Sequence, residues 1–258
     1  MKVRVLGCSG GIGGIGGHRL RTTSMLVDDD ILVDAGTGVA DLSREQLARI
    51  DHVFLTHSHL DHIASLPLLI DSVSDLREKP LMVYATEATL AIIARHIFNW
   101  TIWPDFSVIP SREKALMRYQ AIDLGCSLRV GSGTITALPA EHTVPAVGYH
   151  LDSGAGSLVF SGDTTVNDAF WPLLNRIGNL RYLLIETAFA NREQRLAEIS
   201  KHLCPSMLAS ELRKLTITAE IYISHLKPGQ AELTMAEIQA CAGDLEPKML
   251  QNGQIFEF

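Results

Sequence analysis

One stretch of the sequence is dense in residue types that bind metal ions: Thr56-His57-Ser58-His59-Leu60-Asp61-His62. It follows the apolar residues 53–55, which predict a strand that ends where the stretch begins. Imidazole and carboxylate groups hold zinc, manganese or iron at catalytic sites with an open position. In the loop beyond a strand, His57 and His59 can aim at one point, while Asp61 and His62 aim at a second. The stretch therefore predicts a site for two metal ions, rather than a polar loop with incidental histidines.

Length and composition narrow the class of protein. The chain has 258 residues, of which 47% are apolar and 20% charged, as in ordinary soluble globular proteins. We expect a single domain over residues 1–258. The N-terminus resembles a strand and not a signal peptide, and no run of 18 apolar residues occurs, so we expect a cytoplasmic protein without a membrane segment.

The charge and the cysteine positions argue against further classes of protein and of metal site. The net charge of −7 comes without a basic run, which argues against a dominant nucleic-acid surface. The four cysteines are far apart and form no CxxC pair. This argues against a disulfide framework and against a thiolate zinc site.

Further residues of ligand type follow other predicted strands. His142 comes after residues 134–138, Asp163 follows residues 157–160, and His225 directly follows an apolar strand that begins at Glu220. Sites assemble at strand ends in layered α/β folds, so we expect these side chains to meet the first stretch. Taken alone, Asp163 is more typical of an N-cap for a helix near residues 166–176.

Two other carboxylates at strand ends leave two interpretations open. Asp34 can orient a ligating histidine from behind, or cap a helix over residues 39–49. Glu186 can orient a ligand in the same way, or form a structural ion pair.

The glycine-rich residues 7–17 contain a GxGxxG pattern at Gly11, Gly13 and Gly16. A dinucleotide-binding loop must open a helix, whereas residues 24–27 here predict a strand. We therefore expect a flexible loop beside the site, with some contact to a ligand.

Residues 97–106 hold four aromatic side chains, and Pro104 prevents a simple continuation of the helix predicted over residues 86–96. The aromatic side chains can form a satellite core. Alternatively, Phe98, Trp103 and Phe106 wall a pocket for a flat ligand such as a nucleobase. The segment could also serve as the interface of a homodimer.

The motifs together resemble those of the metallo-β-lactamase superfamily, in order and spacing, across essentially the whole chain: His57 to His62, His142, Ser161-Gly162-Asp163-Thr164 and Ser224-His225. This resemblance implies an α/β fold, an αββα sandwich of two mixed β-sheets flanked by helices, with metals at one edge. It also implies that a first metal is bound by His57, His59 and His142. A second metal would be bound by Asp61, His62 and His225, and the Asp163 carboxylate would bridge both.

Within the superfamily the sequence looks similar to the class II cyclic-nucleotide phosphodiesterases, in residues 57–62, 98–106, 186–189, 202–205 and 225–228. This implies hydrolysis of 3′,5′-cyclic AMP or cyclic GMP to the 5′-monophosphate through a hydroxide that bridges two divalent metal ions. Zinc is the first candidate, with manganese and iron open. The residues expected to bind this small phosphodiester are Phe98, Asn99, Trp103 and Asp105.

The implied chemistry assigns roles to three more groups. Two close metal ions lower the pKa of a bound water and clamp phosphoryl oxygens. Asp61 can orient the nucleophile, and His202 can protonate the leaving alkoxide, although a capping role for His202 is equally open. Glu186 completes the expected catalytic set.

Ribonuclease Z is a competing resemblance, because residues 142–149 look like its third motif. Ile185 stands where that family has a histidine, and the sequence shows no arm rich in glycine and lysine. Thioesterases and lactonases with the same kind of site are further alternatives.

Overall fold

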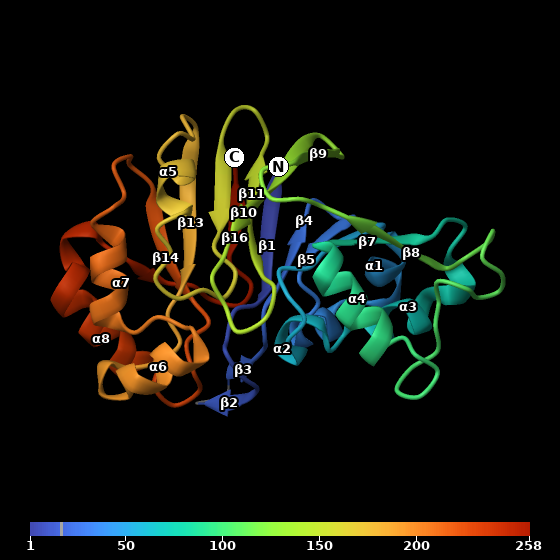
Figure 1. The fold of residues 1–258 in the computed structure, drawn as a ribbon, viewed down its shortest axis with the longest axis horizontal. Helices are drawn as coiled ribbons and strands as arrows, with labels where there is room; N and C mark the ends of the chain where they lie inside the picture. Colours follow the sequence, from blue (N-terminus) through green and yellow to red (C-terminus); the bar gives the residue numbers. More distant parts are fainter. Residues whose placement is uncertain (16–17) are drawn as a thin grey trace.

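The computed structural model describes residues 1–15 and 18–258, so Gly16 of the glycine-rich pattern lies outside the described residues. The described residues form two seven-stranded β-sheets, which face each other, and helices cover both outer faces (Figure 1). Both sheets combine parallel and antiparallel pairs. The predicted αββα sandwich is therefore confirmed.

The first sheet has the strand order β16-β1-β4-β5-β6-β7-β8. Its strands from β5 to β8 are parallel, and the others are antiparallel to their neighbours. The bounds are β1 Lys2–Gly7, β4 Ser24–Val27, β5 Ile31–Val33, β6 His52–Phe54, β7 Leu81–Ala85, β8 Met117–Ala121 and β16 Ile255–Glu257. A short separate hairpin consists of β2 Gly13–Ile15 and β3 His18–Leu20.

The second sheet has the order β15-β14-β13-β12-β11-β10-β9, with parallel pairing from β12 to β15. The bounds are β9 Ser127–Val130, β10 Gly133–Pro139, β11 Val147–Asp152, β12 Ser157–Phe160, β13 Leu180–Glu186, β14 Glu220–Ser224 and β15 Lys248–Met249. Each sheet thus has a parallel half, whose strand ends gather at one edge of the sandwich.

The helices divide between the two outer faces (Figure 1). The helices of the first half are α1 Arg44–Arg49, α2 Leu60–Ile63, α3 Leu66–Val73 and α4 Glu87–His96; those of the second are α5 Phe170–Leu174, α6 Gln194–Ser200, α7 Pro205–Leu212 and α8 Ala231–Ala242. Short 3₁₀ turns cover Thr37–Asp41, Ser74–Leu76, Asn191–Glu193 and Gly243–Leu245. None of the helices in the described part of the chain is long and apolar enough to span a membrane.

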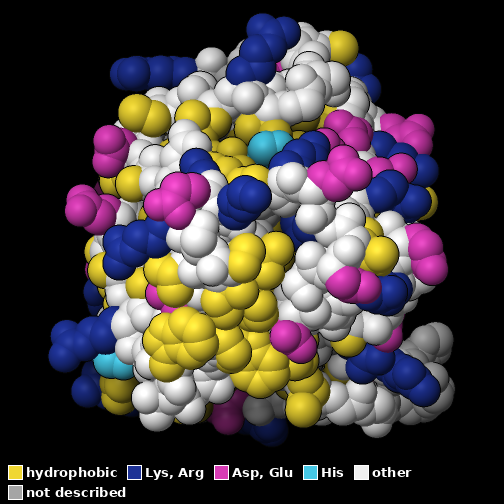
Figure 2. All heavy atoms as spheres, turned by 90° about the vertical axis from the view of Figure 1, so that its right-hand side faces the viewer, with side chains coloured by type: hydrophobic (Ala, Val, Ile, Leu, Met, Phe, Trp, Pro, Cys, Tyr) yellow, Lys and Arg dark blue, Asp and Glu magenta, His cyan; other side chains and the backbone are white. Residues whose placement is uncertain are grey.

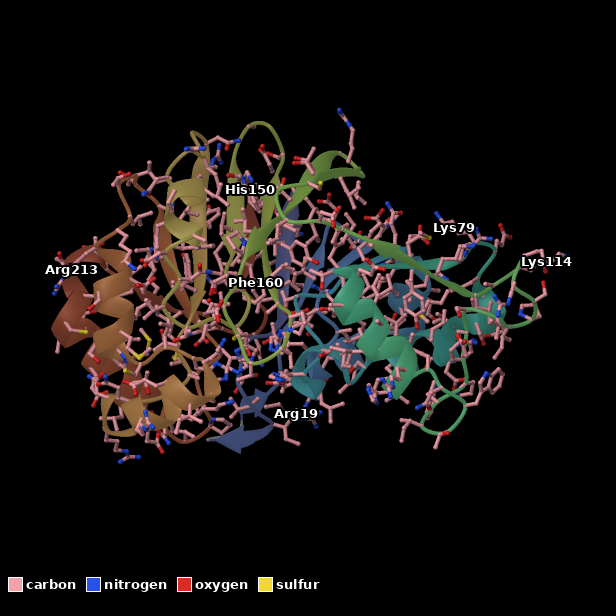
Figure 3. All side chains as sticks on the ribbon, in the orientation of Figure 1. Arg19, Lys79, Lys114, His150, Phe160 and Arg213 are labelled. Atoms are coloured by element: carbon pink, nitrogen blue, oxygen red, sulfur yellow. The ribbon has the colours of Figure 1, made fainter. Side chains whose placement is uncertain are left out.

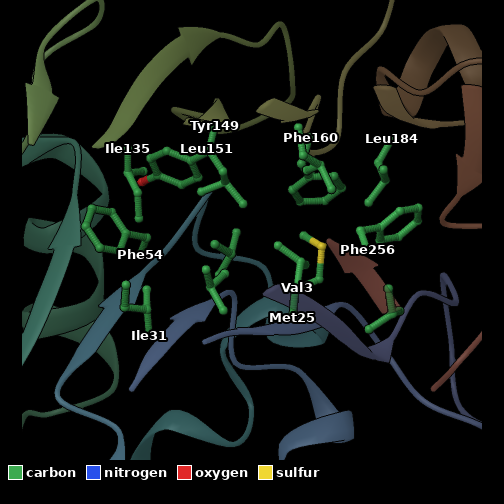
Figure 4. Packing of buried hydrophobic residues seen from close by; sticks show 14 of the residues in the cluster. Val3, Met25, Ile31, Phe54, Ile135, Tyr149, Leu151, Phe160, Leu184 and Phe256 are labelled. Carbon is green, nitrogen blue, oxygen red and sulfur yellow. The ribbon is translucent and has the colours of Figure 1, made fainter. Parts of the chain in front are cut away.

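The main core lies between the sheets, where alternate strand residues point inward (Figure 4). Phe54 stacks on Tyr84 with ring centroids 4.4 Å apart and meets Tyr149 of the other sheet edge-on at 5.7 Å. The Tyr149 hydroxyl donates to the Leu55 carbonyl at 2.8 Å. This bond ties the two sheets together just before the histidine-rich stretch begins.

Several predicted helices differ in the structure. The helix predicted over 39–49 is split, because Ser43 forms a capping box with Gln46 and starts α1 anew. The helix predicted over 166–176 shrinks to α5, whose N-cap is Ala169 and not Asp163. Helix α4 begins as predicted, with the Thr86 side chain accepting from the Thr89 backbone.

Candidate metal centre and active site

The candidate ligands come from the ends of four strands. His57 and His59 follow β6, and Asp61 and His62 lie in α2, the short helix that comes next. His142, Asp163 and His225 follow β10, β12 and β14. Gly162 turns the chain before Asp163 at φ +63, where a Cβ atom would lie 2.6 Å from the Val147 carbonyl oxygen, so only glycine fits there.

The first group of converging side chains contains three histidines and one carboxylate: His57, His59, His142 and Asp163. One ligand atom from each residue lies within 4.8 Å of all the others. His142 Nε2 is 3.1 Å from His59 Nδ1 and 3.9 Å from Asp163 Oδ2. His57 Nε2 is 3.7 Å from the same carboxylate oxygen.

The second group consists of Asp61, His62, Asp163 and His225. His62 Nε2 is 3.3 Å from Asp163 Oδ2, and His225 Nδ1 is 3.2 Å from Asp163 Oδ1. Asp163 therefore belongs to both groups, and its buried carboxylate separates two sets of ligand atoms. The seven side chains meet in the two sets that the family resemblance implies.

Whether the two groups suit metal ions can be judged from the hydrogen bonds that their buried nitrogen and oxygen atoms make. Four buried ligand atoms have no hydrogen-bond partner among the described residues: His57 Nε2, His62 Nε2, His225 Nδ1 and Asp163 Oδ1. An unsatisfied buried polar atom costs about 1–3 kcal/mol, so several at one point call for a missing partner. Since all four belong to the two groups, bound cations are the partner that fits.

The electrostatics of the groups agree with this fit. Burial lowers the pKa of His225 to about 3 and that of His142 to about 4, and it holds the pKa of His57 well below the usual value. These rings are therefore neutral near pH 7, the form that binds metals. Burial raises the pKa of Asp163, but the charge and hydrogen bond of His62, whose own pKa is raised well above the usual value, outweigh it and hold the pKa of this carboxyl well below its usual range.

A fully buried carboxylate, Asp34, lies behind both groups. It accepts hydrogen bonds from His62 Nδ1 at 2.7 Å and from the Thr56 backbone and hydroxyl at 2.8 Å each. The Thr56 hydroxyl in turn lies 3.0 Å from His57 Nδ1, from which it can accept. Such contacts fix the tautomer and orientation of metal-binding rings. The structure thus favours the orienting role for Asp34 over the capping role.

A second buried carboxylate, Glu186, holds a histidine outside the two groups. It accepts from His202 Nδ1 at 2.7 Å and from the backbone of Thr164 and Leu203 at 3.1 and 3.3 Å. The His202 ring stacks on His225, with centroids 5.1 Å apart and planes 20° apart. Burial lowers the pKa of His202, but the charge and hydrogen bond of Glu186 outweigh this and raise it above the usual value. His202 thus lies beside the second group of ligands, with its Nδ1 engaged by Glu186.

The residues expected to bind substrate lie elsewhere, beyond α4 on the outer side of the first sheet (Figure 1). Phe98 is 2% exposed in the core under α4, and Trp103 packs against the same cluster. The Asn99 side chain accepts from the backbone of residues 101 and 102, and Asp105 accepts from Ser107. The structure does not bring these four side chains to the metal groups, because packing and local turns already engage them.

The outer side of this segment is apolar. The face that carries α3 and α4 shows a broad area of hydrophobic side chains (Figure 2). The exposed apolar side chains of these elements and of the segment are Leu68, Trp100 and Ile102. A homodimer interface here stays a prediction.

Not every histidine or cation belongs to the site. His150 of β11 lies toward the opposite end of the molecule from Arg19 (Figure 3). The labelled side chains Lys79 and Lys114 lie at the right-hand side of the same view, and Arg213 lies at the left-hand edge.

Three features near the site received no role from the sequence. Thr56 and Lys227 each adjoin a ligand motif, a position that could have marked them. The third is a shallow pocket of about 530 Å³, lined by Thr86, Ala88, Leu124 and residues 140–147, His142 included. Its signal is the run of small and apolar residues that follows His142.

Comparison with known proteins agrees with the observed fold. Residues 29–242 match the family described as the β-lactamase superfamily domain. The chain belongs to the β-lactamase superfamily. The resemblance inferred from its motifs is thereby confirmed.

The relatives of this superfamily member include named phosphodiesterases. It is 26% identical over 220 residues to a probable 3′,5′-cyclic-nucleotide phosphodiesterase of Yersinia pestis, covering 74% of this chain and 62% of the relative. It is 31% identical over 184 residues to a 3′,5′-cyclic-nucleotide phosphodiesterase of Aliivibrio fischeri, covering 65% and 54%. The chain thus matches less than two thirds of the length of either relative.

Other similar proteins include a ribonuclease and a protein whose structure has been solved. A ribonuclease Z of Thermococcus kodakarensis is 29% identical over 124 residues, covering 46% of this chain and 36% of that protein. The solved structure of unliganded yeast PDE1 superposes with a TM-score of 0.82 at 16% identity, covering 100% and 99% of the two chains. This structural likeness concerns the fold alone.

Proposed function

We propose that the protein is a metal-dependent phosphodiesterase that hydrolyses 3′,5′-cyclic AMP or cyclic GMP to the 5′-monophosphate. The observation that carries the proposal is the buried Asp163 carboxylate, shared by two groups of ligand side chains, four of whose buried atoms have no hydrogen-bond partner among the described residues. The two relatives named as cyclic-nucleotide phosphodiesterases support the choice of substrate.

In this proposal the ligands divide as the two groups do. His57, His59 and His142 would hold the first divalent ion and Asp61, His62 and His225 the second, and Asp163 belongs to both groups. Two bound ions, with zinc the first candidate and manganese or iron as alternatives, would supply a water of lowered pKa and neutralise charge on phosphoryl oxygens.

The chain itself supplies orientation and proton transfer. The Asp61 side chain is 28% exposed, more than the buried rings beside it, so it can meet the attacking water and orient it. His202, held by Glu186 through Nδ1, can donate a proton from its other ring nitrogen to the leaving 3′-oxygen. The buried second sphere of Asp34 and Thr56 keeps two ligand rings in their binding tautomers.

A ribonuclease Z-like nuclease is the second candidate, because relatives of that name match part of the chain. Against it, Ile185 is buried where that family's motif has a histidine. Thioesterase and lactonase activities remain alternatives. A small phosphodiester substrate, a cytoplasmic location and a homodimer stay predictions.

The test is steady-state hydrolysis by the metal-reconstituted protein. Cyclic AMP and cyclic GMP are compared with bis-p-nitrophenyl phosphate and a precursor tRNA, with Asp163→Ala as the blank. Turnover of a cyclic nucleotide with kcat/KM within about 10⁴–10⁸ M⁻¹s⁻¹ supports the proposal. Weak cleavage of the generic diester alone would remove the cyclic-nucleotide assignment, and processing of the tRNA would favour the nuclease.

A further inference from the structure

Lys227 lies two residues after His225, and its ammonium group sits beside the second group of ligands. Lys227 Nζ is 3.5 Å from His225 Nε2 and donates to the Gly10 carbonyl at 2.9 Å. It also lies 5.7 Å from the centroid of the Phe189 ring. The side chain is only partly exposed, so this position is set by its surroundings.

The charge of this ammonium is not balanced by a carboxylate. No Asp or Glu oxygen of the described residues lies within 4.0 Å of Lys227 Nζ, whereas Lys248, which also lies over an aromatic ring, pairs with Glu220 at 2.8 Å. A partly buried cation next to a metal-binding group is favourable only when an anion neutralises it. The Gly10 carbonyl and, at 3.5 Å, His225 Nε2 engage two of its three N–H donors, so one remains for such an anion.

The glycine-rich loop is built to hold this arrangement. Gly10 packs so closely on His225 that a Cβ atom would lie 2.6 Å from its carbonyl oxygen and 2.9 Å from its ring. The Gly10 backbone donates to the Leu226 carbonyl at 3.1 Å, and the His225 backbone donates to the Cys8 carbonyl at 2.7 Å. The two segments are thus fastened together, and Gly10 is the residue that lets its carbonyl reach the ammonium.

We infer that Lys227, fixed by the Gly10 carbonyl, forms a subsite for a phosphoryl oxygen of the substrate and product beside the second metal-binding group. A lysine ammonium binds phosphate as a compact point charge. The inference rests on the proposed function, because a phosphodiester is the anion it supposes. It assigns a binding role to the glycine-rich loop that the sequence pattern alone left open.

The test measures anion binding and does not depend on cyclic-nucleotide turnover. The metal-loaded wild type, Lys227→Met and Lys227→Arg are titrated calorimetrically with inorganic phosphate and with 5′-AMP, and their metal content is determined. Lys227→Met should weaken the binding of both probes by about ten- to a hundredfold at unchanged metal content, the range for a hydrogen bond to a charged group. Lys227→Arg should regain most of this affinity.

The matched control is Lys248→Met, which removes an ammonium that lies over an aromatic ring but pairs with Glu220. It should bind both probes as the wild type does. Unchanged phosphate affinity in Lys227→Met would overturn the inference, as would loss of bound metal in that variant, which would assign Lys227 to positioning His225. Lysine-dependent phosphate binding without turnover of any cyclic nucleotide would remove the proposed function and keep the subsite.

Discussion

Two buried pairs of a carboxylate and a histidine flank the metal groups, and they look alike at close range. Asp34 accepts from His62 Nδ1 and Glu186 accepts from His202 Nδ1, each at 2.7 Å, and both carboxylates are fully buried. In both pairs the carboxylate raises the pKa of its histidine against the effect of burial, for His62 together with Asp163.

The pairs differ in what the other ring nitrogen faces. His62 Nε2 lies 3.3 Å from Asp163 and has no hydrogen-bond partner among the described residues, so it is placed as a metal ligand. His202 belongs to neither ligand group and stacks on His225 at the side of the site. In the proposed function the same local pair therefore serves metal binding in one case and proton donation in the other, because the surroundings of the second ring nitrogen differ.

The largest loss of activity should follow substitution of Asp163. Of the two paired histidines, only His62 lies close to this carboxylate, with Nε2 at 3.3 Å from Oδ2. We expect Asp163→Ala to lose metal from both groups and to lower kcat/KM by more than about a thousandfold, since metal ions supply several kcal/mol to such reactions. Elemental analysis after dialysis measures the metal, and circular dichroism controls for folding. Retention of both ions in this variant would contradict the shared role of Asp163.

Asp34→Asn should weaken metal binding by about 10- to 100-fold, because the His62 ring loses the acceptor that fixes its tautomer. Added metal should restore much of the activity. Competition with a chelator measures the affinity, and Asp41→Asn, which removes an exposed carboxylate paired with Arg21, is the control. If metal affinity stayed at the wild-type level, the orienting role of Asp34 would be wrong.

Glu186→Gln should act on proton transfer and leave metal content unchanged. We expect kcat to fall by about 10²-fold, with a smaller change in KM, as for the loss of a general acid. Glu186 raises the pKa of His202, so its removal lowers that pKa and His202 loses its proton at lower pH. The alkaline limb of the kcat profile should therefore shift to lower pH. A loss of metal in this variant would contradict this assignment, because the Glu186–His202 pair would then support metal binding as the Asp34–His62 pair does.

Thr56→Val should have the smallest effect of the four, because it removes the hydroxyl contacts to Asp34 and His57 but keeps the Asp34–His62 bond. His57 Nδ1 loses its acceptor, so the affinity of the first group should fall by about tenfold, the low end for such partners. Thr56→Ser should restore it. Stepwise titration with cobalt, followed by its absorption, would separate the two groups. Equal weakening of both would mean that Thr56 acts through Asp34 alone.

Much of the site was readable in the sequence because each ligand motif is local. Residue types at short spacing in 57–62, and single ligands directly after apolar strands at 142, 163 and 225, need no knowledge of distant contacts. The parallel strands β12 and β14 align their carboxyl ends, which brings Asp163 and His225 to one edge, whereas β10 before His142 is antiparallel to both neighbours. The pattern of apolar residues likewise predicted strands, including β12 with its observed bounds of 157–160.

The tertiary structure decided the roles that depend on partners far away in the chain. Asp34 binds Thr56 and His62, which lie 22 and 28 positions later in the sequence, and Glu186 binds His202, 16 positions later. No rule of local residue spacing predicts contacts over such separations. The aromatic side chains of 97–106 fit a pocket wall and a core equally well by composition, and only packing under α4 distinguishes them. Gly10 and Lys227 are 217 residues apart, so their contact exists only after the two halves of the sandwich have closed.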